Sequence, residues 1–180
     1  MVSLRRSILY LFFMTLFFPV LATAVVPGFF DTTFNSPNGF ATYLTPFMYG
    51  ERPNAVALQI DGKIVVVDTT AELSGEAQIA VIRYNPDGSL DRSFNGSGRV
   101  LYNNYYLSFA TDVAIQAEDG KIVVAGFRSP KERNWYDVIL LRYNSNGTLD
   151  TSFNGGVGEV VFDNNVSFDG VNTIASLALQ

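Results

Sequence analysis

Short apolar runs separated by polar turn residues extend along most of the chain. Val, Ile, Leu and Tyr are concentrated in these runs, and Gly, Asn, Asp and Pro lie between them. This pattern is typical of β-strands, and it shows no amphipathic helix after residue 24. We predict strands at residues 54–59, 63–68, 78–85, 98–103, 112–116, 121–127, 137–144 and 158–163. The sequence therefore predicts an all-β fold.

The predicted strands are grouped by a repeat. Arg83-Tyr84-Asn85 returns 59 residues later as Arg142-Tyr143-Asn144, and the hairpin signal Asp61-Gly62-Lys63 returns as Asp119-Gly120-Lys121. Copy two has one extra residue before its Asp-Gly turn, which costs little because loop closure depends weakly on length. A fixed period of this size indicates an array of one supersecondary unit.

Each repeat contains four strands, and some of its apolar runs are continuous. Ile64–Val67 and Val138–Leu141 do not alternate with polar residues, which predicts strands covered on both faces. Four-stranded sheets covered on both faces are the blades of a β-propeller. The period exceeds the roughly 40–50 residues of common propeller repeats, and longer blade loops would account for the excess. A parallel β-helix, with a much shorter coil repeat, is the alternative.

Fragments of the repeat stand at both ends of the array. Asp31-Thr32-Thr33-Phe34-Asn35 matches residues 91–95, and Ala178-Leu179-Gln180 matches the start of a repeat. We therefore predict about two full antiparallel blades plus partial ones, an incomplete propeller that is a piece of a longer protein or must assemble. The predicted units are a partial blade at 25–53, whose fourth strand lies within Phe29–Leu44, blades at 54–111 and 112–170, and the start of a third repeat at 171–180.

The repeat motif resembles a known family. Ala57-Leu58-Gln59 with Asp61-Gly62-Lys63-Ile64-Val65-Val66, followed by Arg83-Tyr84-Asn85-Pro86-Asp87-Gly88-Ser89-Leu90-Asp91, is similar to the delta-60 repeat of bacterial secreted proteins. The resemblance covers about residues 28–180. It implies a β-propeller domain of unknown function and an exported bacterial protein, and it implies no activity. Members of that family are usually longer, with many repeats.

Residues 1–24 have the organisation of a secretory signal peptide. Arg5 and Arg6 form the positive region, Ser7–Leu21 is apolar, and Ala22-Thr23-Ala24 resembles a cleavage site. The apolar stretch is short for a membrane span of about 20 residues, although an uncleaved anchor is the alternative. We expect a secreted, periplasmic or cell-surface protein. The absence of cysteine excludes disulfides and a lipoprotein anchor.

Charge and composition narrow the classes of function. The chain has 12 basic and 17 acidic residues, and cleavage after residue 24 would change its net charge from −5 to −7. An acidic surface disfavours nucleic acid, whose affinity depends on neutralised phosphates, and an anionic membrane surface. With neither His nor Cys, Ser-His-Asp, Cys-His and thiolate-metal chemistry are excluded. The sequence points to no cofactor and no metal.

The recurring acidic turns have two interpretations. Asp87-Gly88-Ser89-Leu90-Asp91 and Asn146-Gly147-Thr148-Leu149-Asp150 could supply part of a calcium loop, but they lack the full ligand spacing and a closing Glu. We favour the structural interpretation, in which Asp87 and Asn146 form hairpin turns and Asp91 and Asp150 bond nearby backbone. Recurrence itself favours structure, because a functional site normally occurs once.

Functional residues are therefore expected where the repeat is broken. Residues 127–137 contain the only Trp of the chain, whereas the equivalent acidic segment of copy one has no aromatic residue. Trp, Tyr and Arg are enriched in binding surfaces, although packing against the next blade is the competing explanation. The candidate ligand-binding residues are Lys131, Arg133, Trp135 and Tyr136.

Rigid blades joined by variable loops favour an exported, non-catalytic binding or scaffolding module. Its partner would be a protein or a polysaccharide, and unclosed blades could also associate with each other. The alternative is a propeller enzyme that cleaves polysaccharide through two carboxyl groups at a defined separation. The non-repeated acids are too scattered to nominate such a pair: Glu51, Glu72, Glu76, Glu132 and Glu159.

Overall fold

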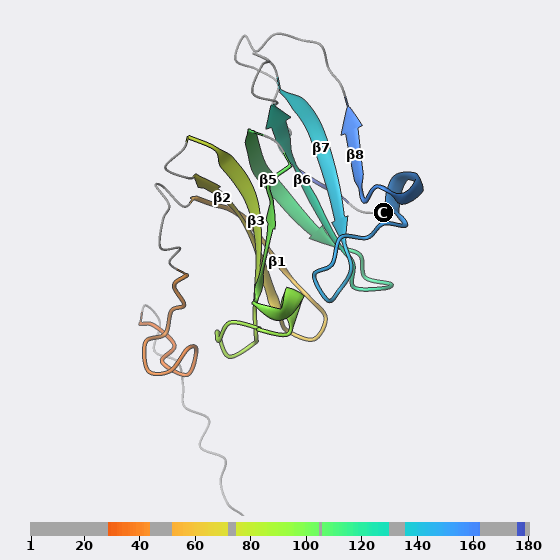
Figure 1. The fold of residues 1–180 in the computed structure, drawn as a ribbon. Helices are drawn as coiled ribbons and strands as arrows, with labels where there is room; N and C mark the ends of the chain where they lie inside the picture. Colours follow the sequence, from red (N-terminus) through yellow and green to blue (C-terminus); the bar gives the residue numbers. More distant parts are fainter. Residues whose placement is uncertain are drawn as a thin grey trace, which may run out of the picture.

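The computed structural model describes residues 29–43, 52–71, 75–104, 106–129, 136–162 and 176–178. The described residues between 52 and 162 form two four-stranded antiparallel blades that lie face to face (Figure 1). The first blade contains β1 (Arg52–Leu58), β2 (Ile64–Ala71), β3 (Ala77–Tyr84) and β4 (Arg99–Tyr102). The second contains β5 (Leu107–Ile115), β6 (Ile122–Ser129), β7 (Asp137–Tyr143) and β8 (Glu159–Phe162).

The strand connections are local within each blade. Each blade is an antiparallel meander in which every strand pairs with the next one along the chain. One parallel residue pair, Ala77 with Leu107, joins β3 to β5, and β5 also packs against β1 and β2. The prediction of an all-β fold with propeller-type blades is confirmed. Among the described residues the helical segments are two short 3₁₀ turns, η1 (Phe94–Gly96) and η2 (Phe153–Gly156), and no helix there could span a membrane.

The Asp-Gly hairpins form as the sequence predicts. Gly62 and Gly120 have φ angles of 81° and 69°, in the left-handed region that favours glycine. The carboxylates of Asp61 and Asp119 accept hydrogen bonds from the backbone N–H of Lys63 and Lys121, both at 3.1 Å. The Asp-Gly-Lys signal therefore fixes where the first two strands of each blade turn.

We expect Gly120→Val to lower the free energy of unfolding by about 1–3 kcal/mol, because a β-branched residue is strained at positive φ. Space is not the cause, since a Cβ at this position would meet only the Cβ of Ser145, at 3.8 Å. Gly120→Asn is the matched control, because Asn tolerates this region of φ and should keep most of the stability. Thermal denaturation of the three proteins checks the prediction, and an unchanged midpoint in Gly120→Val would contradict it.

Two predicted strand positions differ from the structure. The fourth strand expected within Phe29–Leu44 is wrong for the described part, residues 29–43, which form turns and coil without strand pairing. A fourth blade strand pairs with a third strand, and no third strand of that blade is present in the described residues. In addition, β5 begins at Leu107 rather than Asp112, because its pairing with β6 continues past a bulge between Ala110 and Asp112.

The continuous apolar run of β2 is not covered equally on both faces. Val65 and Val67 are fully buried, whereas Ile64 and Val66 are half-buried. The buried pair faces the second blade, and together the two blades enclose the hydrophobic core of the described residues. The prediction of two covered faces is therefore confirmed only in part for this strand, because a neighbouring blade covers one face and residues 29–43 cover part of the other.

Candidate functional site

The same charged cluster occurs in both blades. In the first blade, buried Arg83 donates to Asp91 at 2.8 Å, and the Lys63 ammonium lies 3.3 Å from the same carboxylate. In the second blade, Arg142, Asp150 and Lys121 repeat this arrangement, with separations of 2.7 and 3.2 Å. Each Arg also lies over a Phe ring of its own blade. This cluster ties the third strand to the turn that leads into the fourth.

The acidic turns fit the structural interpretation. One carboxylate oxygen of Asp91 accepts hydrogen bonds from the backbone N–H and the hydroxyl of Ser93, at 3.0 and 2.6 Å. Asp150 binds Ser152 in the same way, at 3.0 and 2.6 Å. The side chain of Asp87 likewise accepts from Ser89. Within the described ranges, no group of three or more acidic residues is placed to hold a metal ion. These hydrogen bonds give the turn carboxylates a structural role.

Asp91 makes stability depend on pH. Burial alone would raise the pKa of this carboxyl, but hydrogen bonds from Ser93 and Lys63 and the charge of Arg83 outweigh burial and lower the pKa to about 2. A group with a lowered pKa contributes stability above its ordinary pKa, and the contribution disappears as the pH falls toward the folded value.

We therefore expect the free energy of unfolding to fall between about pH 4 and pH 2, with about 1–2 kcal/mol of the loss due to Asp91 after allowance for solvent screening. Urea denaturation at several pH values measures this loss. Asp91→Asn removes the titrating group, so its denaturation midpoint should depend less on pH over the same range. An equally steep dependence in the variant would contradict the assignment.

A second repeated feature joins neighbouring units. The Phe94 ring packs on Gly147 of the second blade, where an added Cβ would come within 2.9 Å of the ring. The next residue, Asn95, donates its backbone N–H to the carbonyl of Asn146 at 2.8 Å. Phe34 packs on Gly88 of the first blade in the same manner, and Asn35 donates to the Asp87 carbonyl. The turn of one unit is thus inserted into the Asx-Gly turn of the next.

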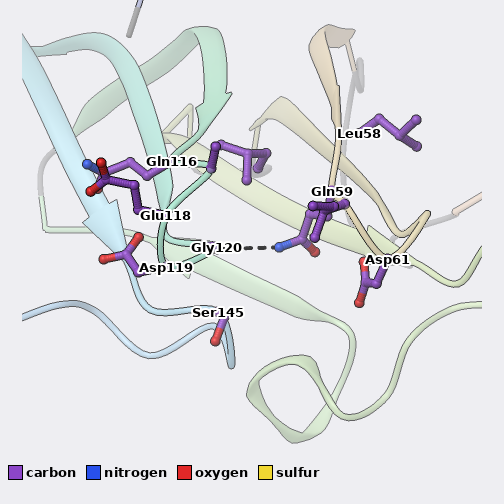
Figure 2. Close-up of a pocket in the computed structure, with 11 residues that line it drawn as sticks. Leu58, Gln59, Asp61, Gln116, Glu118, Asp119, Gly120 and Ser145 are labelled. Carbon is purple, nitrogen blue, oxygen red and sulfur yellow. Dashed lines mark hydrogen bonds between the residues drawn. The ribbon is translucent and has the colours of Figure 1, made fainter. Parts of the chain in front are cut away.

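The best candidate for a ligand site is a groove of about 540 Å³ between the first hairpins of the two blades. Figure 2 shows Gln59 of the first hairpin pointing across the groove to Gly120 of the second, with a 3.4 Å hydrogen bond between them. The walls are aliphatic and acidic. The residues that line the groove are Leu58, Gln59, Ile60, Asp61, Ile115, Gln116, Ala117, Glu118, Asp119, Gly120 and Ser145.

The polar groups of the groove favour hydroxyl groups, and a cationic group at Glu118, because Asp61 and Asp119 already lie 3.7 and 3.3 Å from the ammonium groups of Lys63 and Lys121. The carboxylates of Asp61, Glu118 and Asp119 line it, and the buried Oε1 of Gln116 has no hydrogen-bond partner in the described part of the chain. The hydrogen bond from the Lys121 backbone holds the pKa of Asp119 below its ordinary value. Asp119 is therefore an anion at neutral pH.

The sequence-predicted loop is only partly described. Lys131, Arg133 and Trp135 lie outside the described residues, and Tyr136 is half-buried with its ring edge-on to Phe109, at a centroid distance of 5.9 Å. Tyr136 therefore packs within the second blade. The proposed binding role of all four residues stays a prediction.

We expect iodide to quench the fluorescence of Trp135 only weakly, because packing against a blade is the more usual role of an aromatic residue in a blade-edge loop. The single Trp of the sequence makes the signal unambiguous. Fluorescence is measured against iodide in the native chain and in the chain unfolded in urea. Equal quenching of the two would show an exposed indole and favour a binding surface.

The sequence alone does not reveal the groove, because its residues belong to the repeated hairpins, whose recurrence indicates a structural role. One signal was available. Copy two has an extra residue before its Asp-Gly turn, and this insertion brings Glu118, an acid without a counterpart in copy one, into the groove. A search for residues that break the repeat therefore identifies Glu118 in the groove as well as the loop that contains Trp135.

Comparison with known proteins supports the fold. A family described as "Domain of unknown function (DUF5122) beta-propeller" matches residues 59–94 and 117–153. No curated protein and no solved structure matches the chain. Each matched segment starts at or beside the first hairpin of a blade and ends at its Phe turn, Phe94 or Phe153. The two described blades, each with a matched segment, thus form an incomplete β-propeller, and the match supports a β-propeller repeat family of unknown function.

Proposed function

We propose that this protein is an exported, non-catalytic binding or scaffolding module that holds an extracellular protein or polysaccharide in the groove between its blades. The assignment of its repeats to the delta-60 type is part of this proposal. The groove is the observation that carries it, since pockets with apolar walls and a few convergent polar groups are the usual form of a ligand site.

The chemistry of the groove limits the ligand. Leu58, Ile60 and Ile115 offer apolar contact, and the carboxylates and the Gln116 amide oxygen accept hydrogen bonds. A ligand that fits has donors beside an apolar face. A Lys- or Arg-containing peptide and a sugar ring both meet this requirement.

The binding test uses arrays of immobilised oligosaccharides and of basic peptides. Retention of the purified chain on a subset supports the proposal. Glu118→Gln should weaken that retention about tenfold, because a hydrogen bond to a charged group contributes about 1.5–3 kcal/mol. Glu76→Gln is the matched control, since it removes the same charge outside the groove. Retention nowhere on either array would contradict the proposal.

The same oligosaccharides test the competing class. A propeller enzyme needs one carboxyl group that stays protonated as the general acid, and that group must have a raised pKa. The lowered pKa of Asp119 is opposite to this requirement. An enzyme, rather than a binding module, would be favoured if the purified chain released shorter sugars and if Glu118→Gln abolished this release.

A further inference from the structure

The two blades bury each other through opposite faces. The first blade presents Tyr102, Ile79 and Thr69 to the second, and these residues share one face because they are paired in register. The second blade presents Val113, Val124 and Leu141, which are likewise paired in register. The joint between the blades is therefore heterologous: the face of the first blade that takes part in it differs from the face of the second.

The repeat relates each inner face of this joint to the outer face of the other blade. Val113 of the second blade corresponds by the repeat to Val56 of the first, and Tyr102 of the first corresponds to Phe162 of the second. Val113 is 6% exposed and Tyr102 is 4% exposed, whereas Val56 is 66% exposed and Phe162 is 54% exposed. The same apolar positions are thus covered inside the joint and open outside it.

The open faces keep the apolar character of the covered ones. On the outer side of the first blade, Ile64, Val66 and Tyr84 occupy the positions of Ile122, Val124 and Tyr143, so all three residue types are identical. On the outer side of the second blade, Val138 and Leu140 occupy the positions of Ile79 and Val81. The outer face of the first blade therefore resembles the inner face of the second blade, and the outer face of the second blade resembles the inner face of the first. The two outer faces should fit each other as the two inner faces do.

The N-terminal segment covers part of the first outer face. Phe34, Ala41 and Tyr43 line a cavity of about 330 Å³ over Ile64, Val66 and Tyr84. Val56 and Leu58, on the same face, stay exposed. The segment therefore occupies the turn at Gly88, on which Phe34 packs, and leaves the β1 edge of the face exposed to another molecule.

Among the described residues, a polar contact that crosses the joint is missing at the outer face of the second blade. Arg83 donates across the joint to the Ser145 carbonyl, and Tyr102 donates its hydroxyl to Glu159. Arg142 corresponds to Arg83, and it has no such bond to another blade within the described ranges. A further repeat placed on this face would supply the missing acceptor.

We propose that a second copy of this chain docks here, with the part of its first blade's outer side that residues 29–43 leave open, around Val56 and Leu58, against the outer side of the second blade. A heterologous contact of this kind propagates head to tail and gives a ring when the rotation closes. Propellers typically have about 4–8 blades, so a ring of this kind closes when the blades of the associated copies reach that range.

The test is the mass of the purified chain by light scattering across a range of concentrations, with two variants at exposed positions. Val56→Asp blocks the face of the first blade, and Phe162→Asp blocks the face of the second. Each variant alone should be a monomer, because every contact needs one intact face of each kind. A 1:1 mixture of the two should form a dimer and nothing larger.

Ile60→Asp is the control, since it adds the same charge at a fully exposed residue in the hairpin turn and should associate as the unsubstituted chain does. Three results would overturn the proposal: a monomeric unsubstituted chain at all concentrations, self-association of either single variant, or a mixture that stays monomeric. All three variants lie at exposed positions, so circular dichroism should show the native strand content in each.

Discussion

Phe94→Ala is expected to lower the free energy of unfolding by about 3–5 kcal/mol, the usual range for truncating a buried Phe. Its ring is fully buried, lies under the guanidinium of Arg83 at 4.6 Å and packs on Gly147 of the second blade. Removal leaves a cavity within the joint, so both blades should lose stability together. Urea denaturation followed by circular dichroism measures the change.

The repeat supplies a control for this substitution. Phe153 occupies the same turn of the second blade and lies under Arg142 at 4.4 Å, but it is only half-buried. In dilute solution, Phe153→Ala should cost clearly less than Phe94→Ala, because the described residues place no further blade over its ring. Equal losses would show that the contact within the turn, rather than insertion into the neighbouring blade, stabilises the fold.

Asp91→Ala is expected to cost about 3–5 kcal/mol, because removing one partner of a buried pair leaves the other charge uncompensated. Arg83 would then be buried without its carboxylate, and the backbone N–H of Ser93 would lose its acceptor. Asp150→Ala is the matched change in the second blade, where Arg142 is more exposed than Arg83, so hydration should reduce the loss. Thermal denaturation of both variants compares them, and a larger loss in Asp150→Ala would contradict this account.

The eight strands could be predicted because their signals are local. Asp-Gly turns separate β1 from β2 and β5 from β6, and apolar runs identify β3 and β7 by composition alone. A strand that depends on a distant partner cannot be found in this way. Residues Phe40–Tyr43 follow the repeat in sequence, yet they form no strand, because strand formation needs a paired neighbour and not only a suitable sequence.

The candidate site was harder to predict than the fold. Asp61 and Asp119 were correctly assigned to hairpin turns, but the groove exists only because two such hairpins lie side by side. The ion cluster could have been inferred, since Lys63, Arg83 and Asp91 all recur in copy two as Lys121, Arg142 and Asp150. Opposite charges that recur at one period belong to the same structural unit, and pairing is the simplest reason for their recurrence.

The small number of backbone contacts between the blades has a consequence for local unfolding. Within a blade, ladders of hydrogen bonds couple each strand to the next. Between the blades, the backbone contacts among the described residues are the pairing of Ala77 with Leu107 and the hydrogen bond from Asn95 to Asn146, and side chains make most of the joint. Side-chain contacts can loosen without breaking any ladder, so each blade should open as its own cooperative unit. Amide hydrogen exchange would then show two groups of protected amides, divided at residues 103–106. The packing of the joint would set the difference between their free energies of opening.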